Sequence, residues 1–139
     1  MNRVLAIFLI TMASVAATGA NAQGRELKVN IPFDFTVGNT SMPAGEYTIT
    51  APFQEVLELQ AAGHSASVVS AESNLESKSG SKLVFRKYGD QYFLHDVLCP
   101  DTASLNLEVG PSKAEKYARQ HATEAKLPNN GEQIMVAAR

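Results

Sequence analysis

The stretch that decides the fold is LKVNIPFDFTV, which runs from Leu27 to Val37. Apolar side chains recur there at every second position, at Leu27, Val29, Ile31, Phe33, Phe35 and Val37. Successive side chains of a β-strand point to opposite faces, so this period of two predicts a strand with one buried face. Pro32 cannot donate a hydrogen bond to a neighbouring strand, and we expect a bend or break there.

Shorter alternating segments follow, separated by turn residues. Apolar and polar residues alternate within residues 47–51, 56–60 and 105–109, and residues 65–70 predict a further short strand centred on Val68 and Val69. Residues 71–81 are polar and rich in serine, which predicts the longest exposed loop of the chain and a mobile one.

Residues 82–98 predict a β-hairpin. Two segments rich in aromatic and β-branched residues flank Gly89-Asp90, a pair typical of a tight turn. Two registers remain open, because a two-residue loop pairs Phe85 with Leu94, whereas a bulged loop pairs Phe85 with His95.

The periodicity changes to that of a helix near the C-terminal end. Ser112 and Glu115 have the spacing of a capping box. Apolar residues then recur at helical spacing: Ala114, Tyr117, Ala118, Ala122 and Ala125. We expect a helix over 112–126, and residues 132–137 form either a last short strand or a frayed tail.

These segments predict a mainly β fold. About seven short strands with regular turn signals are typical of an antiparallel β-sandwich or a small β-barrel. We expect one domain over residues 23–139, with the C-terminal helix covering an edge or an open end of the strands.

The first 22 residues have the pattern of a secretory signal peptide. Arg3 precedes an apolar run from Val4 to about Ala17, and Ala20-Asn21-Ala22 supplies the small residues that signal peptidase recognises. The run is shorter than the roughly 20 apolar residues of a membrane span. We expect cleavage after Ala22, export to the periplasm or the extracellular space, and no stable membrane anchor afterwards.

The charge balance argues against nucleic acid as a partner. The chain of 139 residues has 12 Lys and Arg against 14 Asp and Glu. Cleavage would remove Arg3 alone and leave 11 basic residues against the same 14 acidic ones. Binding to phosphates requires clustered Lys and Arg, which this chain lacks.

The sequence offers no catalytic or metal motif. Cys99 is the single cysteine, and His64, His95 and His121 lie on three different predicted elements. Four residues of strand span roughly 13 Å, so His95 and Cys99 would share a face without touching. We therefore expect no metal, no cofactor and no catalytic residue, with acidic residues on solvated faces: Asp34, Glu46, Glu55, Glu58 and Asp96.

Tyr88 and Tyr92 flank the predicted hairpin turn, where we expect both rings to be exposed. Tyrosine is common at contact surfaces because it combines an apolar ring with a hydroxyl group. Together with His95, these two residues form the candidate contact surface for a protein or a small ligand.

Four segments resemble small exported proteins of unknown function from environmental Gram-negative bacteria. The segments are Val29–Gly38, Met42–Tyr47, Lys82–Leu94 and Ser112–Glu115, which include IPFDFTVG, PAGEY and KLVFRKYGDQYFL. The resemblance implies export and a mostly β fold, and it implies no activity. Pro-Ala-Gly-Glu-Tyr is also similar to the strand-entry turn of prealbumin-like and other surface β-sandwiches.

Three functional hypotheses remain open. The first is an exported, non-enzymatic β-domain of the cell envelope that binds an envelope protein or a small ligand. The second is a small secreted enzyme with a site assembled around His95 and Asp96. The third is an envelope structural protein that self-associates through an exposed strand edge near residues 27–37.

Overall fold

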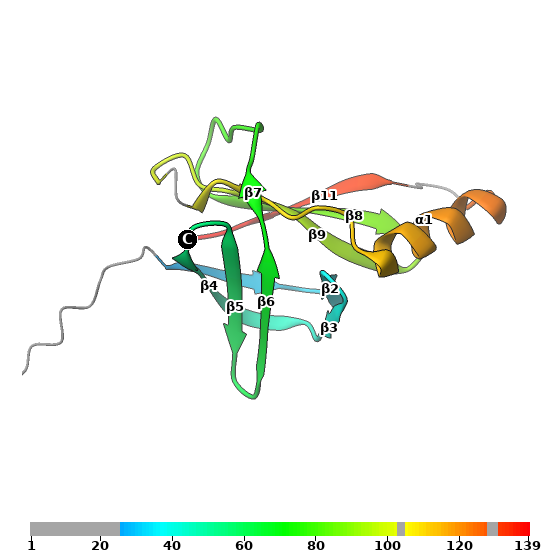
Figure 1. Cartoon of the computed structure of the whole chain (residues 1–139), viewed down its shortest axis with the longest axis horizontal. Coiled ribbons are helices and arrows are strands. Elements are labelled where there is room, and N and C mark those ends of the chain that lie inside the picture. The colour runs from blue at the N-terminus through cyan, green and yellow to red at the C-terminus, as the bar shows by residue number, and fades with distance from the viewer. Residues whose placement is uncertain (1–25, 103–104, 128–130) are drawn as a thin grey trace, which may run out of the picture.

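The computed structural model describes residues 26–102, 105–127 and 131–139. This part of the chain forms eleven β-strands in two curled sheets and one helix (Figure 1). The predicted mainly β fold with one C-terminal helix is confirmed, with more and shorter strands than the sequence indicates. The predicted signal peptide, residues 1–22, lies outside the described residues.

The first sheet contains four antiparallel strands. Their order is β1 (Leu27–Ile31), β4 (Gly45–Phe53), β5 (Val56–Ala61) and β6 (His64–Val69). Alternate side chains on these strands are buried, so one face of the sheet covers the core while the other is largely exposed.

The second sheet contains the predicted hairpin at its centre. Its main order is β11 (Glu132–Ala137), β8 (Lys82–Tyr88), β9 (Gln91–Leu98), β10 (Leu107–Glu108) and β7 (Ala71–Glu72). β2 (Phe35–Val37) pairs in parallel with β9 at Thr36 and Phe93, and antiparallel with β3 (Thr40–Met42). Residues 132–137 therefore form a strand, paired along β8.

The break expected at Pro32 is confirmed. β1 ends at Ile31 and pairs within the first sheet, whereas β2 begins at Phe35 and pairs within the second. The alternation continues across the break, so apolar residues on both sides enter one core. The single alternating stretch in the sequence thus connects the two sheets.

Two further connections draw the sheets around that core. The chain passes directly from β6 in the first sheet to β7 in the second. Arg139 exchanges two backbone hydrogen bonds with Lys28, at 3.0 and 2.8 Å, and so links the C-terminal end to the free side of β1. The largest enclosed side chains lie between the sheets: Tyr47, Phe85, Ile31, Ile49, Leu57, Leu59 and Leu83.

Helix α1 (Lys113–Glu124) packs on the opposite face of the second sheet, over the turn of the β8–β9 hairpin (Figure 1). The Ser112 hydroxyl accepts a hydrogen bond from the N–H of Glu115 at 3.1 Å, which confirms the predicted start of the helix. Ala118 and Ala122 contact the sheet, whereas Tyr117 is 65% exposed. Small alanine side chains allow the helix to approach the strands closely, and Tyr117 lies on the solvent side.

The prediction that residues 71–81 form one exposed loop is wrong at its start. Ala71 and Glu72 form β7 and pair with β10. Ser73 is buried and its N–H donates to the carbonyl of Asn106 at 2.9 Å. Serine-rich composition gives no indication of this pairing, because the partner strand lies more than thirty residues later.

Candidate functional site

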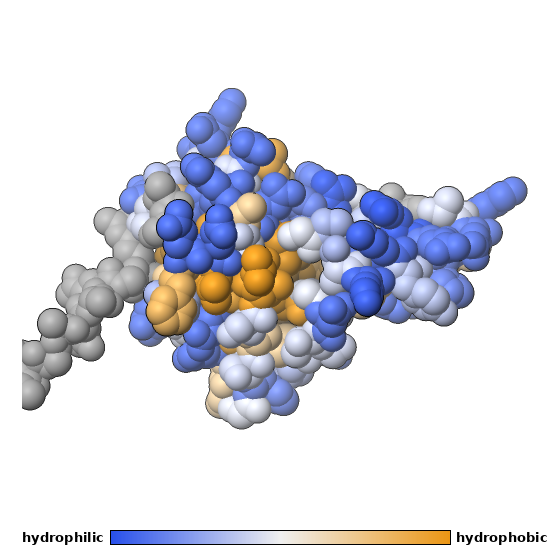
Figure 2. Space-filling view, viewed as in Figure 1, coloured by the Kyte–Doolittle hydropathy of each residue, from blue (hydrophilic) through white to orange (hydrophobic). Residues whose placement is uncertain are grey.

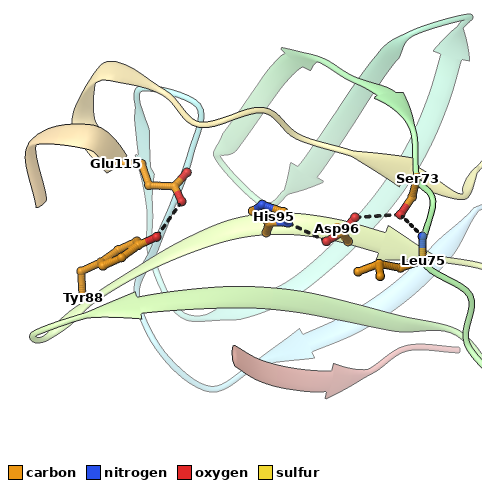
Figure 3. Close-up of polar contacts among 6 residues, drawn as sticks. All are labelled: Ser73, Leu75, Tyr88, His95, Asp96 and Glu115. Atoms are coloured by element: carbon orange, nitrogen blue, oxygen red, sulfur yellow. Dashed lines mark hydrogen bonds and ion pairs between the residues drawn. The ribbon is translucent and has the colours of Figure 1, made fainter. Parts of the chain in front are cut away.

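A β-bulge in β9 decides where His95 and Asp96 point. Phe85 pairs with Leu94 while Val84 pairs with Asp96, which leaves His95 without a partner residue on β8. The two-residue loop and its Phe85–Leu94 register are therefore confirmed. Because the additional residue interrupts the alternation, His95 and Asp96 lie on the same face of the second sheet (Figure 3).

The Asp96 carboxylate is almost fully buried, at 1% exposure, and both of its oxygens are hydrogen-bonded. Nδ1 of His95 lies 2.6 Å from Oδ2, and the Ser73 hydroxyl donates to Oδ1 at 2.8 Å. The Ser73 oxygen in turn accepts from the N–H of Leu75 at 3.1 Å. The prediction that Asp96 lies on a solvated face is wrong, because these bonds replace the water that a buried carboxylate loses.

These three residues have the side-chain types of a catalytic triad but a different arrangement. In such a triad the histidine takes the proton of the serine, and the aspartate orients the histidine. Here Asp96 lies between the other two, and the Ser73 hydroxyl donates to Asp96 (Figure 3). The arrangement fixes the segment at Ser73 to β9 and places no base on the hydroxyl group.

The environment favours the charged form of His95. Its hydrogen bond to Asp96 raises the pKa of His95 above the ordinary 6.5, and the negative charges of Asp96 and Glu115 act in the same direction. Burial and the positive charge of Arg86 oppose this rise in the pKa. A protonated His95 neutralises the buried Asp96 carboxylate.

Tyr88 lies on the same face of the sheet, under α1. It is 5% exposed, and its hydroxyl donates to Oε1 of the equally buried Glu115 at 3.3 Å (Figure 3). Burial raises the pKa of the Tyr88 hydroxyl, and the Glu115 carboxylate raises it further. The prediction that Tyr88 is exposed is wrong, because a helix that begins 25 residues later covers the hairpin turn.

Tyr92 lies on the core side and is half-buried. Its ring stacks on Phe33, with centroids 3.9 Å apart, and the Lys87 ammonium lies 5.4 Å from its centre. Phe33 also meets Phe85 edge to face at 5.0 Å. The ring is therefore held in a fixed position rather than exposed at a free turn.

Tyr92 also lines a surface hollow of about 580 Å³. Three turns of the chain meet at this hollow: the β1–β2 link with Asp34, the β5–β6 turn with His64, and the β8–β9 turn with Asp90. Ser41 of β3 forms part of its wall. Asp34, His64 and Asp90 are exposed, so their polar groups are accessible from solvent.

The three residues predicted as one contact surface thus occupy two places. Tyr88 and His95 lie on the face of the second sheet next to α1, and Tyr92 lines the hollow on the other side. Sequence reasoning missed Ser73 and Glu115 as polar partners of this sheet. One signal was available, since two adjacent polar residues between Leu94 and Val97 interrupt the alternation as a bulge does.

A third surface is apolar. Phe53 and Val69 are 73% and 76% exposed, and both pair with Val56, the first residue of β5. The space-filling view shows this patch over the ends of β5 and β6, with hydrophilic residues around it (Figure 2).

Within residues 26–102, 105–127 and 131–139, no three His, Cys, Asp or Glu side chains gather as a metal site would require. Cys99 is buried, and the Ser81 hydroxyl donates to its sulfur at 3.5 Å. The helix in the described part of the chain lacks the length and the apolar character needed to span a membrane.

Comparison with protein-family models, curated proteins and solved structures finds no match to this chain.

Proposed function

We propose that this chain is an exported, non-enzymatic binding domain of the cell envelope, with the hollow between the three turns as its contact surface. The observation that carries the proposal is the position of the hollow, which is lined by residues of both β3 and β6 although these strands do not pair among the described residues. The ligand is an envelope protein or a small molecule. Export, to the periplasm or the extracellular space, is supported by the N-terminal sequence pattern.

The geometry around His95 supports this proposal over an enzymatic one. Asp96 and Ser73 are buried and bonded to each other, so neither presents a reactive group to a substrate. Exposed polar side chains that have no hydrogen-bond partner among the described residues, those of His64 and Asp90, line the hollow instead.

Backbone amide shifts measured by NMR test the proposal. Protein from expression of the full chain is titrated with a panel of amino acids, dipeptides and simple sugars as probes. We expect at least one probe to move the amide signals of Ser41, His64 and Asp90 together. His64→Ala should abolish the shifts, while the control Lys116→Ala on the outer side of α1 should leave them unchanged.

Two outcomes would contradict the proposal. Shifts that centre on His95 and Asp96, together with turnover of an ester or peptide substrate that is lost in a folded His95→Ala variant, would favour the enzyme. Concentration-dependent association in light scattering, disrupted by a charge introduced into β1, would favour self-association near residues 27–37. Arg139 already occupies part of that edge at Lys28.

A further inference from the structure

We infer that the hollow receives an extended segment of a basic protein, which adds to the free edge of β6 as a further β-strand. This inference rests on the proposed function, because it names the ligand class of the same site. It is carried by the direction of the backbone hydrogen-bonding groups along the free edge of β6, which reaches the hollow at His64, and at Ser41 of β3.

Alternate residues of β6 bond to β5. Ala61 and His64 flank a two-residue turn, which makes them a hydrogen-bonded pair. Every second residue from His64 onward therefore bonds to β5, up to Ser70, whose N–H donates to Glu55 at 2.8 Å. On the other side of the strand, Ser73 donates to Asn106 at 2.9 Å. Ser65 and Ser67, like Ser73, alternate with the residues that bond to β5, so their N–H and C=O groups point away from β5.

Strand β3, which contributes Ser41 to the hollow, also has backbone groups that point away from its partner strand. Val37 and Thr40 flank the turn at Gly38, whose φ of 59° suits a tight turn, and they form the hydrogen-bonded pair next to it. Ser41 is the alternate residue, so its backbone groups point away from β2. No backbone hydrogen bond joins β3 to β6 in the described residues, and Ser41 of β3 and His64, the first residue of β6, both line the hollow.

The edge of β6 lacks the features that usually prevent strand addition. Its sequence, HSASVV, contains no Lys, Arg, Asp, Glu or Pro, and natural edge strands commonly carry such residues to prevent pairing with another chain. The outer edge of β1 carries Lys28 and is bonded to Arg139. Of the two edges of the first sheet, β6 is therefore the better suited to strand addition.

The lining of the hollow defines the chemistry of the added segment. Asp34 and Asp90 are acidic, and none of the described Lys or Arg residues lines the hollow. Phe35, Met42 and Tyr92 supply an apolar wall. A segment that alternates apolar side chains with Lys or Arg satisfies both features, as in other cases of strand addition to a sheet edge.

A selection from phage-displayed random nonapeptides against protein from the full chain tests the inference, with the strongest binder then made as a synthetic peptide. We expect selected sequences to alternate apolar and basic residues, and binding to weaken with salt. Ser67→Pro removes an N–H that points away from β5 along the free edge of β6, and we expect about tenfold weaker binding, the value of one backbone hydrogen bond. Ser67→Ala, the matched control, keeps the N–H and should bind as the wild type does.

A measurement on the unmodified protein does not depend on the folding of Ser67→Pro. Bound peptide should protect the amide hydrogens of Ser65 and Ser67 from exchange, since these bonds form only in the complex. A peptide that shifts His64 and Asp90 without protecting these amides would overturn strand addition and leave the proposed function standing. If the selection enriches no peptide, the inference is overturned. If neither a peptide nor any other probe binds at the hollow, both the inference and the proposed function are overturned.

Discussion

The face of the second sheet next to α1 and the hollow between β3 and β6 use polar residues in opposite ways. On the sheet face, Asp96 and Glu115 are buried and each accepts hydrogen bonds from this chain. At the hollow, Asp90 and His64 are exposed. Along the edge of β6 that begins at His64, the backbone groups of Ser65 and Ser67 that point away from β5 face no paired strand in the described structure. Polar groups that are bonded internally stabilise the fold, whereas exposed and unbonded groups remain available to a ligand.

Replacing Asp96 tests the sheet face most severely. Asp96→Ala leaves His95 and the Ser73 hydroxyl without their shared acceptor inside the protein. Removing one partner of a buried charged pair costs about 3 kcal/mol, so we expect the free energy of unfolding to fall by about that amount. Urea denaturation followed by circular dichroism measures the change, and a fall below about 1 kcal/mol would show that Asp96 is not structural.

Tyr88→Phe is expected to have a smaller effect on the same face. The variant keeps the ring against Phe93 and removes only the hydroxyl that donates to Glu115. A buried acceptor that loses its partner costs about 1 to 2 kcal/mol. Urea denaturation measures this as well, with Tyr117→Phe as the control, because Tyr117 is exposed on the outer side of α1.

Tyr88 also shows how far the structure could be predicted from the sequence. Alternation predicted the strands, because the side chains of a half-buried strand are alternately apolar and polar along the sequence. The break was predicted from Pro32 itself, which has no N–H to donate. Alternation cannot show what covers a face. Tyr88 therefore appeared exposed beside its turn, although α1 covers it.

β7 was missed for a similar reason. It has two residues and pairs with β10, which lies within the predicted segment 105–109 and also pairs with β9. The sequence of β7 contains no period to detect, and its formation depends on the chain passing from one sheet to the other. The hollow could not be predicted at all, because it is formed by three turns from distant parts of the chain.

The pH dependence of stability sharpens the account of the sheet face. Because the folded-state pKa of His95 is raised above 6.5, the folded state binds the proton more tightly than the unfolded state does. The resulting stabilisation is fully present below pH 6.5 and is lost as the pH rises through the folded pKa. Asp96, Glu115 and Arg86 are the charged groups that act on this ring.

We therefore expect the urea midpoint to fall between pH 6 and pH 8 in the wild type, and to fall less in His95→Gln. Gln keeps a side chain that can donate to Asp96 but cannot take up a proton. Equal slopes in the two proteins would remove His95 as the cause.

The smallest effects are expected at the hollow, and they complete the comparison. Asp90 and His64 are exposed, and exposed residues without internal partners change stability by less than about 0.5 kcal/mol when replaced. Asp90→Asn and His64→Ala should therefore unfold at the wild-type urea concentration while weakening any ligand held in the hollow. A loss of stability comparable to that of Tyr88→Phe would mean that these residues support the fold, and the distinction between a structural face and a binding face would fail at the hollow.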